Sequence, residues 1–178
     1  LLAAIALAVK GSSPGPVLYR QERMSLNGQT FDILKFRSMP VDAEAGTGAV
    51  WSTKGESRAT PVGAFLRRTS LDELPQFWNV LRGDMSVVGP RPERPTLIEG
   101  FRQQIPGYML RHKTKAGITG WAQVHRGHKH DVSLPDVETK LGFDIEYIGR
   151  WSLWLDMRIL AWTMMGVIQI RRIPKRHQ

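Results

Sequence analysis

Residues 17–36, VLYRQERMSLNGQTFDILKF, carry the clearest structural pattern of this chain. Residues 17–20 and 30–36 alternate apolar and polar side chains, which is typical of short strands. The turn between them, residues 26–29, contains Asn27-Gly28, and Asn-Gly is the strongest short-range hairpin signal. The stretch therefore predicts a β-hairpin.

The segments around the hairpin are mostly helical in pattern. A helix or a turn is predicted over residues 63–68, and helices over 74–81, 94–104 and 136–149, the first of these three ending at Gly83. Non-helical backbone is predicted for residues 41–61 as a mobile surface loop, for 89–92 as a rigid Gly-Pro-Arg-Pro segment, and for 116–130 as a strand plus a loop. We expect an α/β fold, a small strand element surrounded by helices, in one domain over residues 1–178.

The amino-acid composition limits which reactions and partners are possible for this chain. The 178 residues include 25 Lys and Arg, 16 Asp and Glu, and no Cys, for a formal charge of +9. The absence of Cys excludes disulfides, Cys-ligated metal sites and thiol catalysis. The positive charge predicts an anionic partner, which is a nucleic acid, an anionic membrane surface or a phosphorylated substrate.

Both ends of the chain are apolar but too short to span a bilayer. Residues 1–9, LLAAIALAV, would form a helix about 14 Å long, roughly half the hydrocarbon thickness of a bilayer. The sequence begins with Leu rather than Met, so we expect it to be the later part of a longer chain.

The C-terminal stretch, residues 150–173, repeats Trp, Leu, Ile and Met at steps of three and four, and a basic tail follows: Arg171, Arg172, Lys175 and Arg176. Such a stripe usually faces a protein core. Its Trp residues and the basic tail favour instead a helix that lies in the surface of an anionic membrane.

The densest group of reactive residues is RRTSLDELPQ at residues 67–76. Pro75 fits the third position of a helix, which would make Asp72 the N-cap. One interpretation is structural, because Ser70 and Glu73 also have capping-box spacing. The other is catalytic: the helix start would lower the pKa of Asp72, whose carboxylate could then attack phosphorus, while Glu73 could hold a hard cation.

Five motifs in order resemble the bacterial sugar transferases of the monotopic phosphoglycosyl transferase superfamily. They are KFRSM at 35–39, TSLDELPQ at 69–76, NVL at 79–81, GDMSVVGPRP at 83–92 and KAGITGW at 115–121. The resemblance is greatest to the catalytic domain of the large polyprenyl glycosylphosphotransferases that start exopolysaccharide repeat units. It extends over residues 1–170.

This resemblance implies a two-step transfer of hexose 1-phosphate from a UDP-sugar to undecaprenyl phosphate, with release of UMP, at the cytoplasmic face of the bacterial inner membrane. It implies that Asp72 is the nucleophile and that Glu73 binds Mg²⁺. Basic positions for the donor phosphates are Arg37 and Arg91, and the supporting acidic positions are Asp144 and Asp156. Residues 1–10 would be the returning half of a re-entrant membrane helix.

Simpler interpretations remain for several residues. Arg67 and Arg68 could supply charge to bound phosphate or be solvated surface residues. Asp144 could pair with Lys140 or Arg150 along a helix, and Asp156 could belong to the polar face of its helix. The cluster His125, His128 and His130 could bind a metal, but is more typical of a polar loop.

Two other functions compete with the transferase. The chain could be a basic nucleic-acid-binding module, although it has no recognised nucleic-acid motif, or an inactive membrane scaffold. We expect membrane lipid and no nucleic acid among its partners. The larger relatives often pair, so a homodimer is an open alternative. The sequence does not indicate which hexose is moved.

Overall fold

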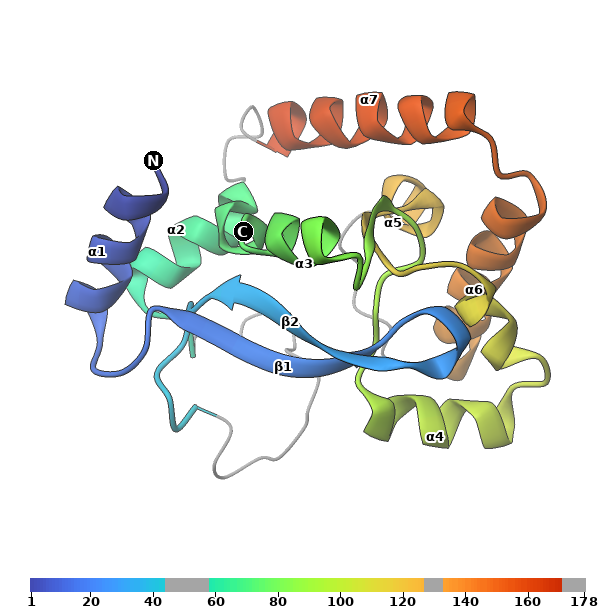
Figure 1. The fold of residues 1–178 in the computed structure, drawn as a ribbon, viewed down its shortest axis with the longest axis horizontal. Coiled ribbons are helices and arrows are strands. Elements are labelled where there is room, and N and C mark those ends of the chain that lie inside the picture. Colours follow the sequence, from blue (N-terminus) through green and yellow to red (C-terminus); the bar gives the residue numbers. More distant parts are fainter. Residues whose placement is uncertain (44–57, 127–132, 171–178) are drawn as a thin grey trace, which may run out of the picture.

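A computed structural model of the chain describes residues 1–43, 58–126 and 133–170, with side chains described as far as residue 166. The predicted hairpin is confirmed (Figure 1). Its strands β1 (Leu18–Met24) and β2 (Thr30–Phe36) pair antiparallel, from Leu18 opposite Phe36 to Met24 opposite Thr30. The first strand is longer than the alternation alone predicted. The turn is a 3-10 segment, η1 (Leu26–Gly28), in which Asn27 has a left-handed φ of 56°.

A second pair of strands, parallel and short, forms a separate sheet. Strand β3 (Ser86–Val88) pairs with β4 (Gly117–Thr119). The backbone of Gly89, directly after β3, lies close to that of Gly117, the first residue of β4. A Cβ on Gly117 would lie 2.1 Å from the backbone nitrogen of Gly89. Both positions therefore require glycine, and their contact brings the Gly-Pro-Arg-Pro segment beside residue 117.

Most of the remaining described chain is helical. The helices are α1 (Leu2–Ser12), α2 (Pro61–Thr69), α3 (Gln76–Arg82), α4 (Pro95–Gln104), α5 (Trp121–Arg126), α6 (Leu134–Gly149) and α7 (Leu153–Ile170), with 3-10 turns η2 (Leu71–Glu73) and η3 (Tyr108–Lys113). The helices predicted over 74–81, 94–104 and 136–149 are present, the helix or turn predicted over 63–68 is a helix, and Gly83 ends α3 with a left-handed φ of 84°.

One sequence-based expectation was wrong, and another falls mostly outside the described residues. Residues 116–130 were expected to form a strand and a loop, but residues 121–126 form α5. This helix is stabilised by tertiary contacts: the rings of Trp121 and Trp162 stack 5.7 Å apart, and Arg126 bonds to Asp136 of α6. Most of the loop predicted for 41–61 lies outside the described residues.

Three clusters of buried side chains hold these elements together. The first joins α1, β2 and α2 through Ile5, Val9, Phe36 and Leu66. The second joins α4, η3 and α6 through Ile98, Ile105, Tyr108, Val137 and Leu141. The third joins β3, α5, α6 and α7 through Val88, Trp121, Tyr147 and Ile159. The segments with the LDELPQ and GPRP motifs run among these clusters.

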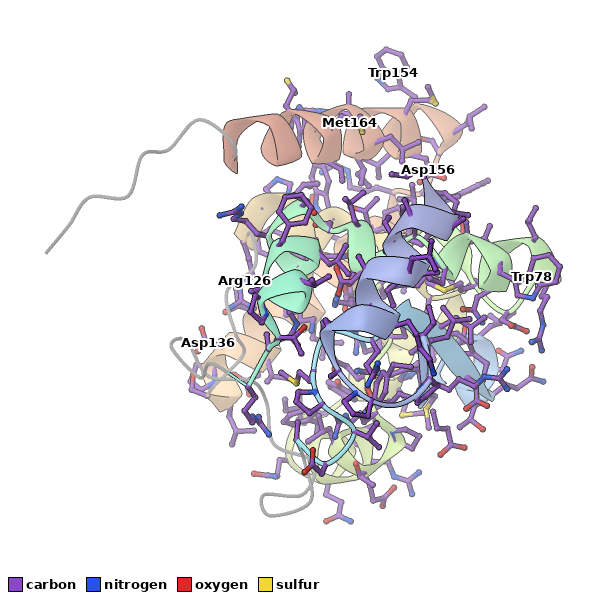
Figure 2. The ribbon with its side chains drawn as sticks, turned by 90° about the vertical axis from the view of Figure 1, so that its left-hand side faces the viewer. Trp78, Arg126, Asp136, Trp154, Asp156 and Met164 are labelled. Carbon is purple, nitrogen blue, oxygen red and sulfur yellow. The ribbon has the colours of Figure 1, made fainter. Side chains whose placement is uncertain are left out.

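Helix α7 lies along one side of the molecule and shows two different faces (Figures 1 and 2). Ile159 is buried against the third cluster, whereas Trp154 is 79% exposed. Figure 2 shows Trp154 on the outer side of the helix and Asp156 on the side toward the rest of the protein. Among the described residues, no helix combines the length and the apolar content needed to cross a membrane.

Candidate active site

The LDELPQ motif forms a tight turn between α2 and α3. Ser70 ends α2 in a left-handed conformation, with φ of 56°, and the 3-10 turn η2 begins at the next residue. Asp72 lies in the middle of this turn, and α3 begins only at Gln76, with Pro75 as its N-cap. The prediction that Asp72 is an N-cap is therefore wrong, because the reversal at Ser70 starts a separate turn before the helix. The capping box is absent too: the Ser70 side chain makes no cap hydrogen bond.

Glu73 lies between two cations. Its Oε1 accepts hydrogen bonds from Nζ of Lys35 at 2.9 Å and from a guanidinium nitrogen of Arg91 at 2.6 Å. Burial alone would raise the pKa of Glu73, but the charges and hydrogen bonds of Arg91 and Lys35 outweigh it and hold that pKa well below its usual range. Glu73 in turn raises the pKa of Arg91. Burial lowers the pKa of Lys35, and the charge of Glu73 opposes that change.

Asp72 has a different environment from its neighbour. Only 7% of its surface is exposed. Burial raises its pKa, the Glu73 carboxylate adds to the rise, and the charges of Lys35, Arg67 and Arg91 offset it only in part. The expected lowering of this pKa is therefore wrong, because it depended on helix-start hydrogen bonds that this geometry does not supply. Adjacent carboxyl groups thus have pKa values shifted in opposite directions.

Three elements fix the Gly-Pro-Arg-Pro backbone that presents Arg91. Arg111 donates to the carbonyl of Arg91 at 2.9 Å, and Arg23 donates to the carbonyl of Pro92 at 3.1 Å. The amide of Gly117 donates to the carbonyl of Pro90 at 2.9 Å. This confirms the predicted irregular segment and explains how a segment outside the ladders is held in place.

Asp144 lies behind this segment. On α6 it accepts from Arg111 at 2.7 Å, and both side chains are 2% exposed. Burial raises the pKa of Asp144, and Arg111 opposes the rise. Helix spacing suggested Lys140 or Arg150 as the partner of Asp144, but its partner is Arg111. Asp144 therefore reaches Arg91 through Arg111.

Asp156 joins helices α6 and α7. Its Oδ1 accepts a hydrogen bond from the hydroxyl of Tyr147 at 2.8 Å. Burial raises the pKa of Tyr147, and the hydrogen bond and charge of Asp156 add to the rise. The Tyr147 hydroxyl also lies 3.4 Å from the carbonyl of Val88. Through Tyr147, Asp156 is thus linked to β3, the strand that leads into the Gly-Pro-Arg-Pro segment.

The predicted basic residues fall into different surroundings. Arg37 is buried, and its guanidinium donates to the carbonyl of Ser13 at 2.7 Å and to that of Pro14, so it ties the end of α1 to the hairpin. Arg67 is exposed at the end of α2, close enough to Asp72 to affect its pKa. Arg68 is exposed too and lies over the ring of Phe65, 5.8 Å from its centre. Arg91 is the predicted arginine that contacts the carboxylate pair directly.

The histidine cluster can be described in part. The ring of His125 packs against Trp121, Phe143 and Trp162, with its Nδ1 2.8 Å from the carbonyl of Trp121. His128 and His130 lie outside the described residues. Within the ranges described, no group of three metal-ligating side chains comes together.

Two residues of the site were missed in the sequence. Lys35 is two positions after the buried Ile33 in β2, so strand alternation places a lysine on a face that turns inward; that signal could have found it. Arg111 lies in a 3-10 segment without clear periodicity, and only the folded chain shows its two partners.

The carboxylate pair fits a magnesium site in which the protein supplies only one or two ligands. Mg²⁺ usually binds one or two protein carboxylates and fills its other positions with water and substrate phosphates. Asp72 and Glu73 are hard oxygen donors at adjacent positions, and no third acidic side chain joins them in the described parts of the chain. The donor set therefore suits a cation shared with a phosphate substrate.

Comparisons with known proteins identify the family of the chain. The family described as bacterial sugar transferase matches residues 1–170. The UDP-glucose:undecaprenyl-phosphate glucose-1-phosphate transferase of Escherichia coli K12 is 52% identical over 164 residues, which are 92% of this chain and 35% of that protein. The protein of the same name from Xanthomonas campestris is 49% identical over 168 residues, 94% of this chain and 35% of that protein.

A relative with another sugar in its name also matches. The UDP-N-acetylgalactosamine-undecaprenyl-phosphate N-acetylgalactosaminephosphotransferase of Aeromonas hydrophila is 44% identical over 168 residues, 94% of this chain and 39% of that protein. The chain thus spans little more than a third of the length of these relatives. The family match nevertheless covers nearly all of it, and the chain belongs to the bacterial sugar transferase family.

Proposed function

We propose that this chain transfers hexose 1-phosphate from a UDP-sugar to undecaprenyl phosphate and releases UMP, as the first membrane step of exopolysaccharide or glycoconjugate synthesis. The observation that carries the proposal is the arrangement of Asp72 beside a carboxylate bound by Lys35 and Arg91. The names of the relatives support the same two substrates.

The reaction proceeds through two displacements at one phosphorus atom. In the first, a carboxylate oxygen of Asp72 bonds to the sugar-linked phosphorus of the donor, the bond from that phosphorus to the UMP oxygen breaks, and UMP leaves with the electron pair. In the second, an oxygen of undecaprenyl phosphate bonds to the same phosphorus and the bond to Asp72 breaks, which restores the carboxylate. Each step exchanges one P–O bond for another.

The charges around Asp72 suit this chemistry. Two basic side chains, Lys35 and Arg91, contact Glu73, and Arg67 is close enough to affect the pKa of Asp72. Basic side chains around Asp72 attract the donor phosphates and stabilise the charge that develops at the transferred phosphoryl group. Glu73, next to Asp72, would hold Mg²⁺, which when bound offsets the repulsion between the carboxylate and the phosphates.

The proposed acceptor is a lipid, and the surface near Asp72 fits one. Helix α3 buries the polar residues Gln76 and Asn79 and exposes Phe77, Trp78 and Leu81, with Trp78 58% exposed. Helix α7 exposes Leu153, Trp154, Met157, Met164 and Met165, and Trp151 is exposed just before it. Figure 2 shows Trp78 and Trp154 both pointing away from the body of the protein.

These helices would lie in the plane of the cytoplasmic leaflet of the bacterial inner membrane. Aromatic side chains at headgroup depth and a basic tail are the features that hold such helices at an anionic surface. Helix α1, with Leu1, Leu2 and Leu7 exposed, would be the returning half of a re-entrant helix.

Incubation with a panel of UDP-sugars, undecaprenyl phosphate and Mg²⁺ tests the proposal. UMP release and lipid product are read separately, and we expect both with one or a few of the sugars. If no UDP-sugar yields UMP, the chain is a scaffold rather than a transferase. Salt-dependent retention of an oligonucleotide, without retention on anionic vesicles, would instead favour the nucleic-acid-binding alternative.

A further inference from the structure

Gln76 is a buried amide without a partner. It is 2% exposed, and within the described residues its Nε2 has no hydrogen-bond partner. A buried donor that makes no hydrogen bond destabilises the fold, so such a group in a native protein requires an explanation. Gln76 is the first residue of α3, directly after the turn that carries Asp72 and Glu73.

The backbone places Gln76 about one turn after the carboxyl pair. Leu74, with φ and ψ of −53° and −37°, and Pro75, with −61° and −18°, continue the right-handed winding of η2 into α3. In a helical segment, side chains three and four positions apart are neighbours on one face. Gln76 lies four positions after Asp72 and three after Glu73 along this winding, and like Asp72 it is buried.

Asn79 shows that a buried amide of this helix can be satisfied by the fold. It accepts from the backbone nitrogen of Leu34 at 3.0 Å and donates to the carbonyl of Asp32 at 2.8 Å and to Oδ2 of Asp84 at 3.1 Å. Asn79 thus binds α3 to β2. The Nε2 donor of Gln76, one turn earlier in the helix, has no such partner within the described residues.

We propose that Gln76 is a further catalytic residue, whose amide N–H donates to a non-bridging oxygen of the phosphoryl group that bonds to Asp72. This inference rests on the proposed function. The phosphoryl group that bonds to Asp72 during the reaction would supply acceptor oxygens for this donor. Lys35 and Arg91 both hydrogen bond to Glu73, so a neutral donor that is not bound to Glu73 would complement them.

The test is Gln76→Met in the membrane-expressed protein, with the covalent adduct followed by mass after mixing with the UDP-sugar donor alone. Methionine keeps the length of the side chain and removes the donor. We expect adduct formation at saturating donor to slow about ten- to a hundred-fold, the size expected for a hydrogen bond to a charged group. We expect the melting temperature to stay the same or rise, because an unsatisfied buried amide has been removed.

Gln123→Met is the matched control. Gln123 also has a buried amide atom without a partner, Oε1, but its Nε2 donates to the carbonyl of Ile118 at 2.9 Å. The control variant should lose stability and keep the wild-type rate of adduct formation. The two glutamines thus give opposite patterns of stability and activity.

Two results would overturn the inference. One is wild-type adduct formation by Gln76→Met, and the other is a melting temperature that falls as in Gln123→Met, which would show a structural partner for the amide. Gln76→Glu provides a second variant, expected to be slow because it replaces the donor with a carboxylate. A wild-type enzyme that forms no adduct with any UDP-sugar would refute the proposed function instead, so the two failures are distinguishable.

Discussion

The guanidinium of Arg111 lies 2.7 Å from the carboxylate of Asp144, and the same guanidinium donates to the carbonyl of Arg91. Arg91 in turn binds Glu73 at 2.6 Å. A chain of contacts therefore leads from α6 to the turn that carries Asp72 and Glu73. It connects Asp144 to Glu73 without a direct contact between them.

Asp144→Asn should destabilise the protein strongly. The substitution leaves Arg111 charged and buried without its counterion, and breaking a buried ion pair in this way costs about 3–5 kcal/mol. Urea unfolding measures the loss. Glu99→Gln is the control, because its pair with Arg102 is about half exposed and should contribute below about 1 kcal/mol. Equal effects of the two substitutions would contradict the structural role of the buried pair.

Asp72→Asn should abolish the covalent adduct and the release of UMP while the fold stays intact. The amide is a poor nucleophile, and the substitution leaves the size of the side chain almost unchanged. Mass analysis after incubation with the donor, together with circular dichroism, checks both parts. Asp32→Asn, at an exposed position of β2, should behave like wild type. UMP release at the wild-type rate from the Asp72 variant would exclude this residue as the nucleophile.

Glu73→Gln should sharply raise the Mg²⁺ concentration required for half-maximal activity. It removes a carboxylate that is ionised at neutral pH and leaves Lys35 and Arg91 to repel a bound cation. A magnesium titration of UMP release measures the change. Glu93→Gln serves as control, since Glu93 is also buried between cations but lies outside the carboxyl pair. An unchanged titration would remove Glu73 as a ligand.

The acid stability of the protein should depend on Glu93. Burial would raise its pKa, but Lys140 at 2.5 Å, Arg111 and Arg23 lower it from 4.5 to about 2. Between these pH values the unfolded chain binds the proton and the folded chain does not. Stability from Glu93 is therefore complete above about pH 4.5 and is lost as the pH falls to about 2.

Glu93→Gln isolates this contribution. The shift corresponds to about 3 kcal/mol at about 1.4 kcal/mol per pKa unit. Unfolding free energies at a series of pH values should show the variant less stable at pH 7 and less sensitive to acid. An acid limb as steep as that of wild type would mean that other carboxyl groups produce it.

Trp154→Glu should weaken binding to anionic vesicles. It removes an exposed aromatic side chain from the outer side of α7 and adds a charge that anionic headgroups repel. Co-sedimentation measures the bound fraction. Tyr19→Glu alters an exposed aromatic residue on β1, away from α7 in Figure 1, and should bind as wild type does. Equal loss from both variants would place the membrane contact elsewhere.

Local patterns were sufficient to predict much of the fold. Alternation and Asn27-Gly28 predicted the hairpin, and Gly83 predicted the end of α3, because these signals act within a few residues. Helix α5 was missed because its six residues are too short for a clear period, and its stability comes from packing on α6 and α7.

The candidate site was predictable in part of its residues but not in its electrostatics. The motif indicated Asp72, Glu73 and Arg91, while the partner Lys35 comes from a strand that only the fold brings near. The direction of the Asp72 pKa shift was wrong since burial, a tertiary property, exceeds the nearby positive charges. Roles for Arg37, Arg67, Arg68, Asp144 and Asp156 in substrate binding or catalysis stay predictions.

Helix α3 carries its polar side chains inward and its aromatic ones outward, directly after the proposed nucleophile. In the proposed orientation, the acceptor never leaves its leaflet to react, and the glycolipid formed stays there as well. Delivery to the next enzyme would then be a search in two dimensions. Its rate would depend on lateral diffusion and on the surface density of that enzyme rather than on release into the cytosol.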